Sequence, residues 1–468
     1  MGPFKLLIDG KLVDGDSTMS VLNPANEEVL TQCPRASKAQ LDTAVAAAKR
    51  AFPAWAATPM DDRRKALLAM ADAIQGDSAN LARILTQEQG KPLPDAMGEV
   101  FGAAAFFRYF STLELPEQII EDSDTRKVVS RRRPLGVVAA IVPWNFPLIL
   151  MAFKVPAALL AGNTMILKPA ATTPLSTLRI AELVKDLLPP GVLNVISDAN
   201  DLGAAITAHP DIRKVSFTGS TETGKKVMAG AAEALKRITL ELGGNDAAIV
   251  LEGNDPKETA GKIFAGAFQN SGQVCIAIKR AYVHESIYDA MCDELAKLAD
   301  AAVMGDGLQQ GVTIGPLQNK TQFQKVLGII EDARGDGKII AGGVPHDGKG
   351  YFIRPTIVRD ITDGSRLVDE EQFGPVLPVI KIMDGEDALS RANASSYGLG
   401  GSIWSKDLDK AFDLASRMDT GTVWINKHAE LAPNIPFGGS KLSGIGTELG
   451  QEGLAEFTQM HVINMAKA

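Results

Sequence analysis

The chain has 468 residues, of which 45% are hydrophobic and 22% are charged. This is the composition of an ordinary folded protein, and it excludes intrinsic disorder as the main state. The length predicts two or three domains, each with its own core. Acidic residues outnumber basic ones by 56 to 48, and the net charge of -8 disfavours binding to the phosphate backbone of nucleic acids.

Only three cysteines occur, Cys33, Cys275 and Cys292, and no two of them form a C-x-x-C pair. Such a low, odd count is typical of a reducing compartment, so we expect a cytoplasmic protein without disulfides. The five histidines are scattered, and no metal site is expected. The most apolar stretch, residues 135–162, is interrupted by prolines, Asn145 and Lys154, which indicates buried interior rather than a membrane span.

The first hundred residues have a helical pattern. Ser37 and Gln40 have the spacing of a capping box, and apolar residues follow at helical intervals. From residue 135 onward, short apolar runs alternate with amphipathic helices, which is typical of parallel βαβ units. The expected elements are helices at 61–74, 77–87, 174–188 and 221–235, and strands at 135–142, 164–167, 192–196, 214–217, 238–240 and 247–251.

This alternation predicts an α/β fold with a doubly wound parallel sheet, which binds ligands at the carboxyl ends of its strands. A second α/β block follows, and the charged segment 122–133 is predicted to form a protruding hairpin. The second block should contain helices at 256–268, 285–303, 384–393 and 408–418 and a strand at 280–283.

The phosphate-binding motifs are incomplete. No G-x-G-x-x-G follows a predicted strand. Residues 219–225 match the first seven positions of a P-loop, but Lys226 stands where Ser or Thr must reach magnesium. The segment is either a plain strand-to-helix turn or, as we favour, a turn in which Ser220 and the following helix offer N–H groups to a pyrophosphate.

Three residues have positions that suit catalysis. Cys275 lies in a polar, glycine-containing segment directly after a helix, where it is either a nucleophile or, more commonly, a small buried residue. Glu241 ends an apolar strand before two glycines, which suits acid–base chemistry or a turn. Asn145 lies between two prolines in an apolar run, either as a turn residue or as a donor to an oxyanion.

Seven segments, in order along nearly the whole chain, closely resemble the aldehyde dehydrogenase superfamily. They are PWNFP at 143–147, KP at 168–169, FTGS at 217–220, ELGG at 241–244, GQVC at 272–275, EEQFGPV at 370–376 and PFGG at 436–439. The glutamate and the cysteine are also separated by the family's interval, 275 minus 241, or 34 residues. The resemblance implies an NAD(P)-dependent, non-acylating aldehyde dehydrogenase.

The resemblance also implies roles for individual residues. Cys275 would attack the aldehyde carbon, Asn145 would hold the oxyanion together with the Cys275 N–H, and Glu241 would activate the hydrolytic water. The expected cofactor is NAD, although Ala171 stands where many NAD-preferring members carry a glutamate, which leaves NADP use open. The cofactor contacts would be Trp144, Lys168, Gly219, Ser220, Leu242, Glu371 and Phe373.

By the same resemblance, an aldehyde tunnel would be lined by apolar side chains, with His428 and Glu430 near its mouth. Those side chains would be Phe146, Ile149, Leu150, Phe153, Val274, Ile276, Leu431 and Phe437, unless they are simply core residues. Such a tunnel favours an uncharged aliphatic or aromatic aldehyde, because a substrate carboxylate would need a buried cation.

The family's domain plan would divide the chain into three parts. These are a dinucleotide-binding domain of residues 1–121 and 134–240, a catalytic domain of residues 241–440, and a small β bridging element of residues 122–133 and 455–468 that supports a homodimer or homotetramer. Two alternatives stay open. One is a coenzyme A-acylating dehydrogenase, whose members generally lack the counterpart of Glu241, and the other is a non-catalytic protein that retains the fold.

Overall fold

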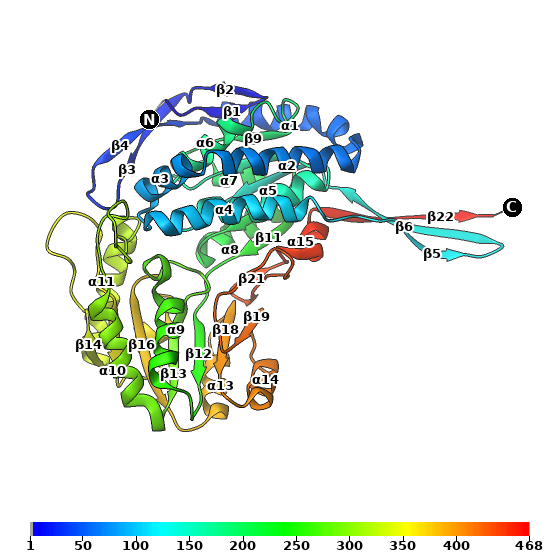
Figure 1. Ribbon diagram of the computed structural model, residues 1–468. Coiled ribbons are helices and arrows are strands. Elements are labelled where there is room, and N and C mark those ends of the chain that lie inside the picture. Colours follow the sequence, from blue (N-terminus) through cyan, green and yellow to red (C-terminus); the bar gives the residue numbers. More distant parts are fainter. Residues whose placement is uncertain (1–2, 468) are drawn as a thin grey trace.

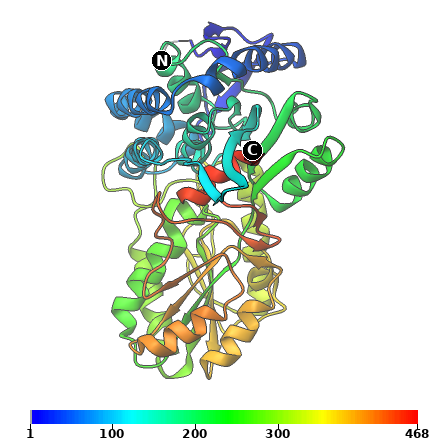
Figure 2. The ribbon, with the colours of Figure 1, turned by 90° about the vertical axis from the view of Figure 1, so that its right-hand side faces the viewer.

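The structure is a computed structural model and describes residues 3–467. Two α/β units stack on one another, and a long β arm projects from the side of the upper unit (Figures 1 and 2). Each unit is built around one mostly parallel sheet with helices against it. Among residues 3–467, no helix is both long enough and apolar enough to cross a membrane.

Residues 6–35 form four strands and the turns between them, so the expectation of a helical first hundred residues is wrong there. These strands are short, and β1 (Leu6–Ile8) pairs with β9 (Leu193–Val195), far along the chain, so local periodicity does not reveal them. The capping box is confirmed: Ser37 Oγ accepts from the Gln40 N–H at 3.2 Å, and the Gln40 side chain bonds back to the Ser37 N–H. The elements are β1 (Leu6–Ile8), β2 (Lys11–Val13), β3 (Ser17–Leu22), β4 (Val29–Arg35), α1 (Lys38–Ala57), α2 (Met60–Gly76), α3 (Ser78–Gln89) and α4 (Leu93–Phe110).

The upper unit contains the predicted doubly wound sheet. Its strand order is β2-β1-β9-β8-β7-β10-β11-β21, and the five central strands are parallel. The chain winds outward from β7 in one direction and from β10 in the other, so the switch point lies between these two strands. The elements are β7 (Val137–Ile141), α5 (Pro147–Leu160), β8 (Thr164–Lys168), α6 (Leu175–Val184), β9 (Leu193–Val195), α7 (Gly203–Ala208), β10 (Ile212–Thr218), α8 (Thr221–Ala232), β11 (Arg237–Glu241) and β21 (Gly444–Ile445).

The lower unit has a seven-stranded sheet in the order β14-β15-β16-β13-β12-β18-β19, and only β14 is antiparallel. The strand predicted at 247–251 belongs here as β12 (Asp246–Val250), not to the first sheet, because the chain leaves that sheet after Glu241. The other strands are β13 (Ile278–His284), β14 (Lys338–Ala341), β15 (Thr356–Arg359), β16 (Val376–Ile382), β18 (Gly400–Trp404) and β19 (Thr422–Ile425). The helices are α9 (Pro256–Phe268), α10 (Glu285–Ala301), α11 (Lys320–Asp336), α12 (Arg366–Asp369), α13 (Gly385–Asn393) and α14 (Leu408–Ser416).

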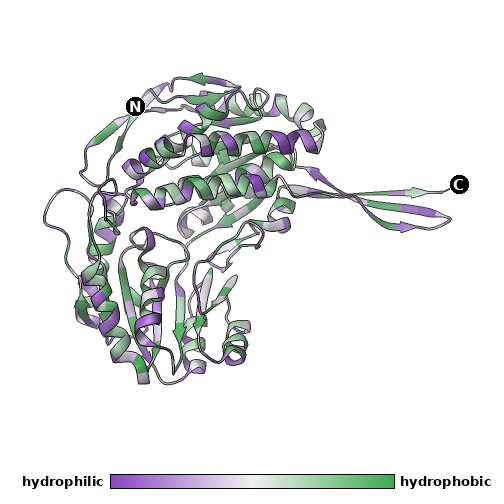
Figure 3. Cartoon of the chain, viewed as in Figure 1, coloured by the Kyte–Doolittle hydropathy of each residue, from purple (hydrophilic) through white to green (hydrophobic). Residues whose placement is uncertain are grey.

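The arm is a three-stranded antiparallel sheet of β5 (Gln118–Asp122), β6 (Arg126–Pro134) and β22 (Thr458–Ala466). Its hairpin begins at Gln118 rather than at residue 122. The third strand, β22, comes after α15 (Gly450–Glu456) and pairs antiparallel with β6 over its whole length. Figure 3 shows hydrophobic colour along the strands of the arm as well as in the two central sheets. The arm is therefore apolar in places although it stands away from either core.

Candidate active site

The segment before Cys275 has an unusual backbone. After α9 ends at Phe268, the residues Asn270, Ser271 and Gly272 have φ values of 49°, 57° and 73°. A left-handed conformation costs a non-glycine residue roughly 1–3 kcal/mol and persists only where surrounding contacts enforce it. Here the Ser271 hydroxyl donates to the Gly315 carbonyl at 2.8 Å, and the Gln273 amide donates to the Asn270 carbonyl at 2.9 Å. The turn that presents Cys275 is thus fixed by its own side chains.

Asn145 is joined directly to this turn. It follows β7, is only 4% exposed, and its side-chain amide donates to the Gln273 carbonyl at 3.0 Å. The Asn145 carbonyl accepts from the Asn270 amide at 3.0 Å and from the Lys91 ammonium at 2.9 Å. These bonds connect the end of β7 to the Cys275 turn across the boundary between the two units.

Glu241 lies at the end of β11 and is 4% exposed. Neither carboxyl oxygen has a hydrogen-bond partner within the part of the chain that the structure describes. Burial raises the pKa of Glu241 well above its usual value, the Glu448 carboxylate raises it further, and the Lys154 ammonium opposes both. An unpaired buried carboxyl that takes up a proton readily is suited to act as a base toward a small molecule such as water.

Lys154 and Glu448 were not among the residues expected at the site. Lys154 Nζ and Glu448 Oε1 are 2.5 Å apart, both side chains are buried, and the Ser216 hydroxyl donates to the same oxygen at 2.9 Å. The sequence shows Lys154 only as a break in an apolar run. A lysine on a buried helix does require an anion, but the partner is 294 residues away.

The Cys275 side chain is partly exposed beside Glu241. Burial raises the pKa of the Cys275 thiol to about 12, the Lys279 ammonium lowers it, and three carboxyl groups raise it. The resting group is therefore a thiol that must lose its proton before it can attack. The three carboxyl groups are those of Glu241, Asp246 and Glu371. Cys33 and Cys292 are fully buried elsewhere.

The two glycines after Glu241 explain how these groups come together. A Cβ atom on Gly243 would lie 2.4 Å from Glu371 Oε2, and one on Gly244 would lie 2.6 Å from the Cys275 carbonyl oxygen. Real Cβ contacts are longer, so only glycine permits this approach. The Gly244 N–H donates to Glu371 Oε1 at 2.9 Å and holds that carboxylate near the nucleophile.

Four of the expected cofactor residues, Lys168, Gly219, Ser220 and Leu242, lie at the carboxyl ends of β8, β10 and β11. Ser220 is the exposed N-cap of α8 and accepts from the Thr223 N–H at 3.3 Å, so the first N–H groups of this twelve-residue helix lie just beyond the carboxyl end of β10. Leu242 packs closely over Gly224 of the same helix, and Gly219 lies just beyond Phe217. A helix N-terminus at a switch point fits a dinucleotide pyrophosphate.

The remaining cofactor candidates form two further contacts. The rings of Trp144 and Phe373 meet edge to face, with centroids 5.5 Å apart, and Phe373 has a φ of 50°. Lys168, at the end of β8, is 2.6 Å from the buried Asp198 carboxylate. Sequence reasoning missed Asp198, which lies past the end of β9. The Asp198 carboxylate thus neutralises the positive charge of Lys168.

All eight expected tunnel residues belong to one continuous apolar cluster that also contacts Cys275. Phe153 packs on Phe106 with ring centroids 4.9 Å apart. The His428 imidazole is only 1% exposed and bonds to the Ile276 carbonyl at 2.7 Å. Glu430 is exposed and pairs with Lys427 at 3.0 Å.

Known proteins share both this sequence and this architecture. Residues 12–463 match the model of the aldehyde dehydrogenase family. The chain is 41% identical over 476 residues to the phenylacetaldehyde dehydrogenase of Pseudomonas fluorescens, covering 97% of this chain and 94% of that protein. An NAD+ complex of an aldehyde dehydrogenase from Bacillus cereus has a TM-score of 0.97 at 38% identity, covering 99% of this chain and 97% of that chain.

A crystal structure of an NADP dependent enzyme from E. coli also has a TM-score of 0.97, at 35% identity, covering 99% of this chain and 98% of that chain. The overall architecture therefore does not by itself separate the two cofactors. The family match extends over nearly the entire chain, and the relatives named above exceed 30% identity over nearly their full length. On these grounds the chain belongs to the aldehyde dehydrogenase family.

Proposed function

We propose that the chain oxidises an uncharged aliphatic or aromatic aldehyde to the carboxylic acid, with NAD(P) as the hydride acceptor. The observation that carries this proposal is the convergence of the Cys275 thiol, the Asn145 amide and the unpaired Glu241 carboxyl. The match to the aldehyde dehydrogenase family supports the reaction class. The alternative of a non-catalytic protein would leave a strained turn and a desolvated carboxyl without a purpose.

The first half of the reaction belongs to Cys275 and Asn145. The Cys275 thiolate attacks the carbonyl carbon, a C–S bond forms, and the carbonyl oxygen becomes an oxyanion. One N–H of the Asn145 amide bonds to Gln273, so the second N–H and the Cys275 backbone N–H are the donors for that oxyanion. When the C=O bond re-forms, the aldehyde hydrogen leaves as hydride, and the acyl group stays on Cys275 as a thioester. Bound NAD(P) would supply the hydride acceptor.

In the second half of the reaction, Glu241 acts as the base. Its carboxylate takes a proton from water, the hydroxide adds to the thioester carbon, and the Cys275 thiolate leaves as the acid forms. Glu241 is intact, which supports hydrolysis over transfer to coenzyme A. The raised pKa of Glu241 makes it a stronger base than an exposed carboxylate.

The apolar cluster supports an uncharged substrate. Lys91, a buried cation 3.6 Å from the centroid of the Phe146 ring, already pairs with Glu99 and is not available to a substrate carboxylate. A relative named for phenylacetaldehyde is consistent with aromatic substrates. Because a buried methylene is worth about 0.8 kcal/mol, two added carbons should raise kcat/KM roughly tenfold. Succinic semialdehyde should be a poor substrate.

The test is a screen of aliphatic, aromatic and carboxylate-bearing aldehydes against NAD and NADP, with and without coenzyme A. Formation of the reduced cofactor and the free acid, independent of coenzyme A, is the expected result. Acyl-coenzyme A as product would replace the proposal by the acylating alternative. A strong preference for succinic semialdehyde would reject the assigned tunnel.

We infer that NAD is preferred over NADP. Lys168 is paired with Asp198, so it offers no free charge to a 2′-phosphate. Ala171→Glu should shift the preference further toward NAD, by adding a carboxylate that accepts ribose hydroxyls and repels the phosphate. The ratio of the two dissociation constants, measured by calorimetry, checks this. An unchanged ratio would show that residue 171 does not face the ribose.

We also propose that the chain forms a homodimer or homotetramer in the cytoplasm. The arm leaves apolar side chains in water, since Ile119 and Ile120 are each 62% exposed and Met465 is 50% exposed. Such a surface is typical of a subunit interface. Light scattering should give a mass of two or four chains, and replacement of Ile119 and Ile120 by lysine should lower it. A monomeric mass for the unmodified chain would reject the assembly.

A further inference from the structure

Two buried side chains hold consecutive carbonyl groups at the nucleophile. The Lys279 ammonium, on β13, donates to the Cys275 carbonyl at 2.6 Å and to the Val274 carbonyl at 2.9 Å. The His428 Nε2 bonds to the next carbonyl, that of Ile276, at 2.7 Å. The Lys279 and His428 side chains are 2% and 1% exposed. Both side chains belong to the lower unit, and both hold the backbone around the nucleophile in place.

The two anchors differ in charge. A carbonyl oxygen only accepts hydrogen bonds, so His428 carries its proton on Nε2, and its Nδ1 accepts from the Ser402 hydroxyl at 3.0 Å. Burial lowers the pKa of His428 to about 3, so the imidazole is neutral at physiological pH. Lys279 carries its charge among carboxylates, with Glu371 Oε1 3.5 Å away.

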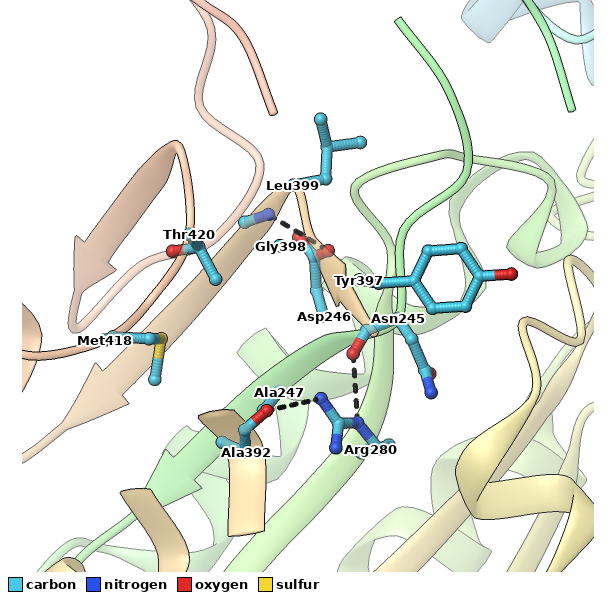
Figure 4. Close-up of a pocket in the computed structure, with 11 residues that line it drawn as sticks. Asn245, Asp246, Ala247, Arg280, Ala392, Tyr397, Gly398, Leu399, Met418 and Thr420 are labelled. Atoms are coloured by element: carbon cyan, nitrogen blue, oxygen red, sulfur yellow. Dashed lines mark hydrogen bonds between the residues drawn. The ribbon is translucent and has the colours of Figure 1, made fainter. Parts of the chain in front are cut away.

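Asp246 completes this buried cluster. One of its oxygens accepts from the Gly400 N–H at 3.2 Å, a bond that is drawn at Asp246 in Figure 4. The other oxygen is unpaired within residues 3–467 and lies 3.7 Å from His428 Nε2. Figure 4 also shows the Arg280 guanidinium turned to the far side of Asn245, where it donates to that residue's carbonyl. Burial raises the pKa of Asp246 to about 7, and Lys279 lowers it.

The charges that face the Cys275 thiol are therefore unbalanced. Glu241 comes from β11, Asp246 from β12 and Glu371 from the segment before β16, and each disfavours a thiolate. Lys279 on β13 opposes these three carboxyl groups and the effect of burial. A thiol in such a setting needs a nearby cation to reach its reactive form.

We propose that Lys279 is a positioning residue for the nucleophile, which holds the Cys275 backbone and also places a positive charge beneath the thiol to favour the thiolate. This inference rests on the proposed function only in taking Cys275 as the nucleophile. It assigns to Lys279 an electrostatic role that the neutral anchor His428 does not share. Lys279 thus supplies the charge, whereas both residues supply the geometry.

The test measures the rate at which iodoacetamide alkylates Cys275 as a function of pH, with the Cys275 peptide quantified by mass spectrometry. Only the thiolate reacts, so at a fixed pH well below the thiol pKa the rate is proportional to the thiolate fraction. Lys279→Met should slow alkylation about tenfold at each pH between about 7 and 9, as expected for a thiol pKa raised by about one unit. The matched control His428→Gln retains a donor for the Ile276 carbonyl and should leave the rate unchanged.

A second variant keeps the proposal testable if Lys279→Met fails to fold. Asp246→Asn leaves Lys279 in place and removes an opposing charge, so alkylation should become faster above pH 7, where Asp246 is ionised. Equal slowing in Lys279→Met and His428→Gln would reduce Lys279 to a backbone anchor and overturn the proposal. An unchanged rate in Lys279→Met, or no acceleration in Asp246→Asn, would overturn it as well. Alkylation requires neither aldehyde nor cofactor, so its failure would not touch the proposed oxidation.

Discussion

The nucleophile and the base of this site are built in opposite ways. The Cys275 turn is held by hydrogen bonds from Ser271, Gln273 and Asn145 and by the Lys279 ammonium below it. Glu241 is buried, yet neither of its oxygens has a hydrogen-bond partner among the described residues. The turn that carries the nucleophile is fixed by hydrogen bonds, whereas the carboxyl group of the base has none among the described residues.

The difference follows from what each group must do. A nucleophile gains most from exact placement, because its attack requires close approach along a defined direction. A base gains from desolvation, since burial raises its affinity for a proton. Hydrogen bonds to the Glu241 carboxylate would stabilise the charged form and weaken the base. Substitutions of the nucleophile and of the base should therefore impair the reaction at different steps.

The largest effect is expected on the nucleophile side. Cys275→Ala should abolish aldehyde-dependent formation of NADH, because no C–S bond can form and no hydride can leave. The measurement is absorbance at saturating aldehyde and NAD. Cys292→Ala is the matched control, as Cys292 is a fully buried cysteine on α10 outside the site, and it should retain turnover. NADH formation by Cys275→Ala would contradict the assignment of the nucleophile.

On the base side, Glu241→Gln should lower steady turnover by about 10²–10⁴, because the amide cannot take a proton from water. Acylation does not use that step. A rapid burst of NADH near one equivalent per site should therefore precede the slow phase, with the acyl group found on Cys275 by mass spectrometry. Loss of the burst would mean that Glu241 also deprotonates the thiol, and undiminished turnover would remove Glu241 from the mechanism.

Asn145→Ala should lower kcat by about 10²–10³ with cofactor affinity intact, because it removes a donor to charge that appears only after attack. Asn145 also holds the Cys275 turn through Gln273, so a second variant separates the two roles. Asn270→Ala removes the bond to the Asn145 carbonyl but leaves the Asn145 amide in place, and its effect on kcat should be smaller. A loss of less than fivefold in Asn145→Ala would reject the oxyanion role.

The sequence predicted the parts of the site that lie in continuous motifs. Glu241 ends a strand, and Asn145 and Cys275 follow a strand and a helix, each in a short, recognisable segment. The apolar runs located the parallel strands. The strands of the first 35 residues were missed because each is short and pairs with distant partners, as β1 does with β9.

The buried charges were missed for a related reason. Lys279 stands four residues after Cys275, and Asp246 five residues after Glu241, yet nothing in either segment shows that both approach His428. The Lys154–Glu448 pair spans 294 residues in the same way. Such contacts depend on how elements far apart in the sequence pack within each unit, and residue patterns within one segment do not encode that.

The smallest effect expected is on stability, and it tests the base side without any substrate. The folded-state pKa of Glu241 is raised, so its contribution to stability is fully present below the unfolded pKa and is lost as pH rises through the folded pKa. Glu241→Gln has no such dependence. Its free energy of unfolding relative to the unmodified protein should therefore increase with pH, by at most about 1.4 kcal/mol per unit.

Urea denaturation at pH 5 and pH 8 measures this difference. Glu222→Gln is the control, because Lys225 lowers the pKa of the exposed Glu222. Its contribution is already present above the unfolded pKa of a glutamate, so the stability of this variant relative to the unmodified protein should be nearly the same at pH 5 and pH 8. A gain in stability on replacing Glu241, together with the loss of turnover, would mean that the fold tolerates a destabilising group for the sake of the reaction. If Glu241→Gln were equally stable at both pH values relative to the unmodified protein, Glu241 would not be desolvated in solution, and the contrast between a bonded nucleophile and an unbonded base would fail.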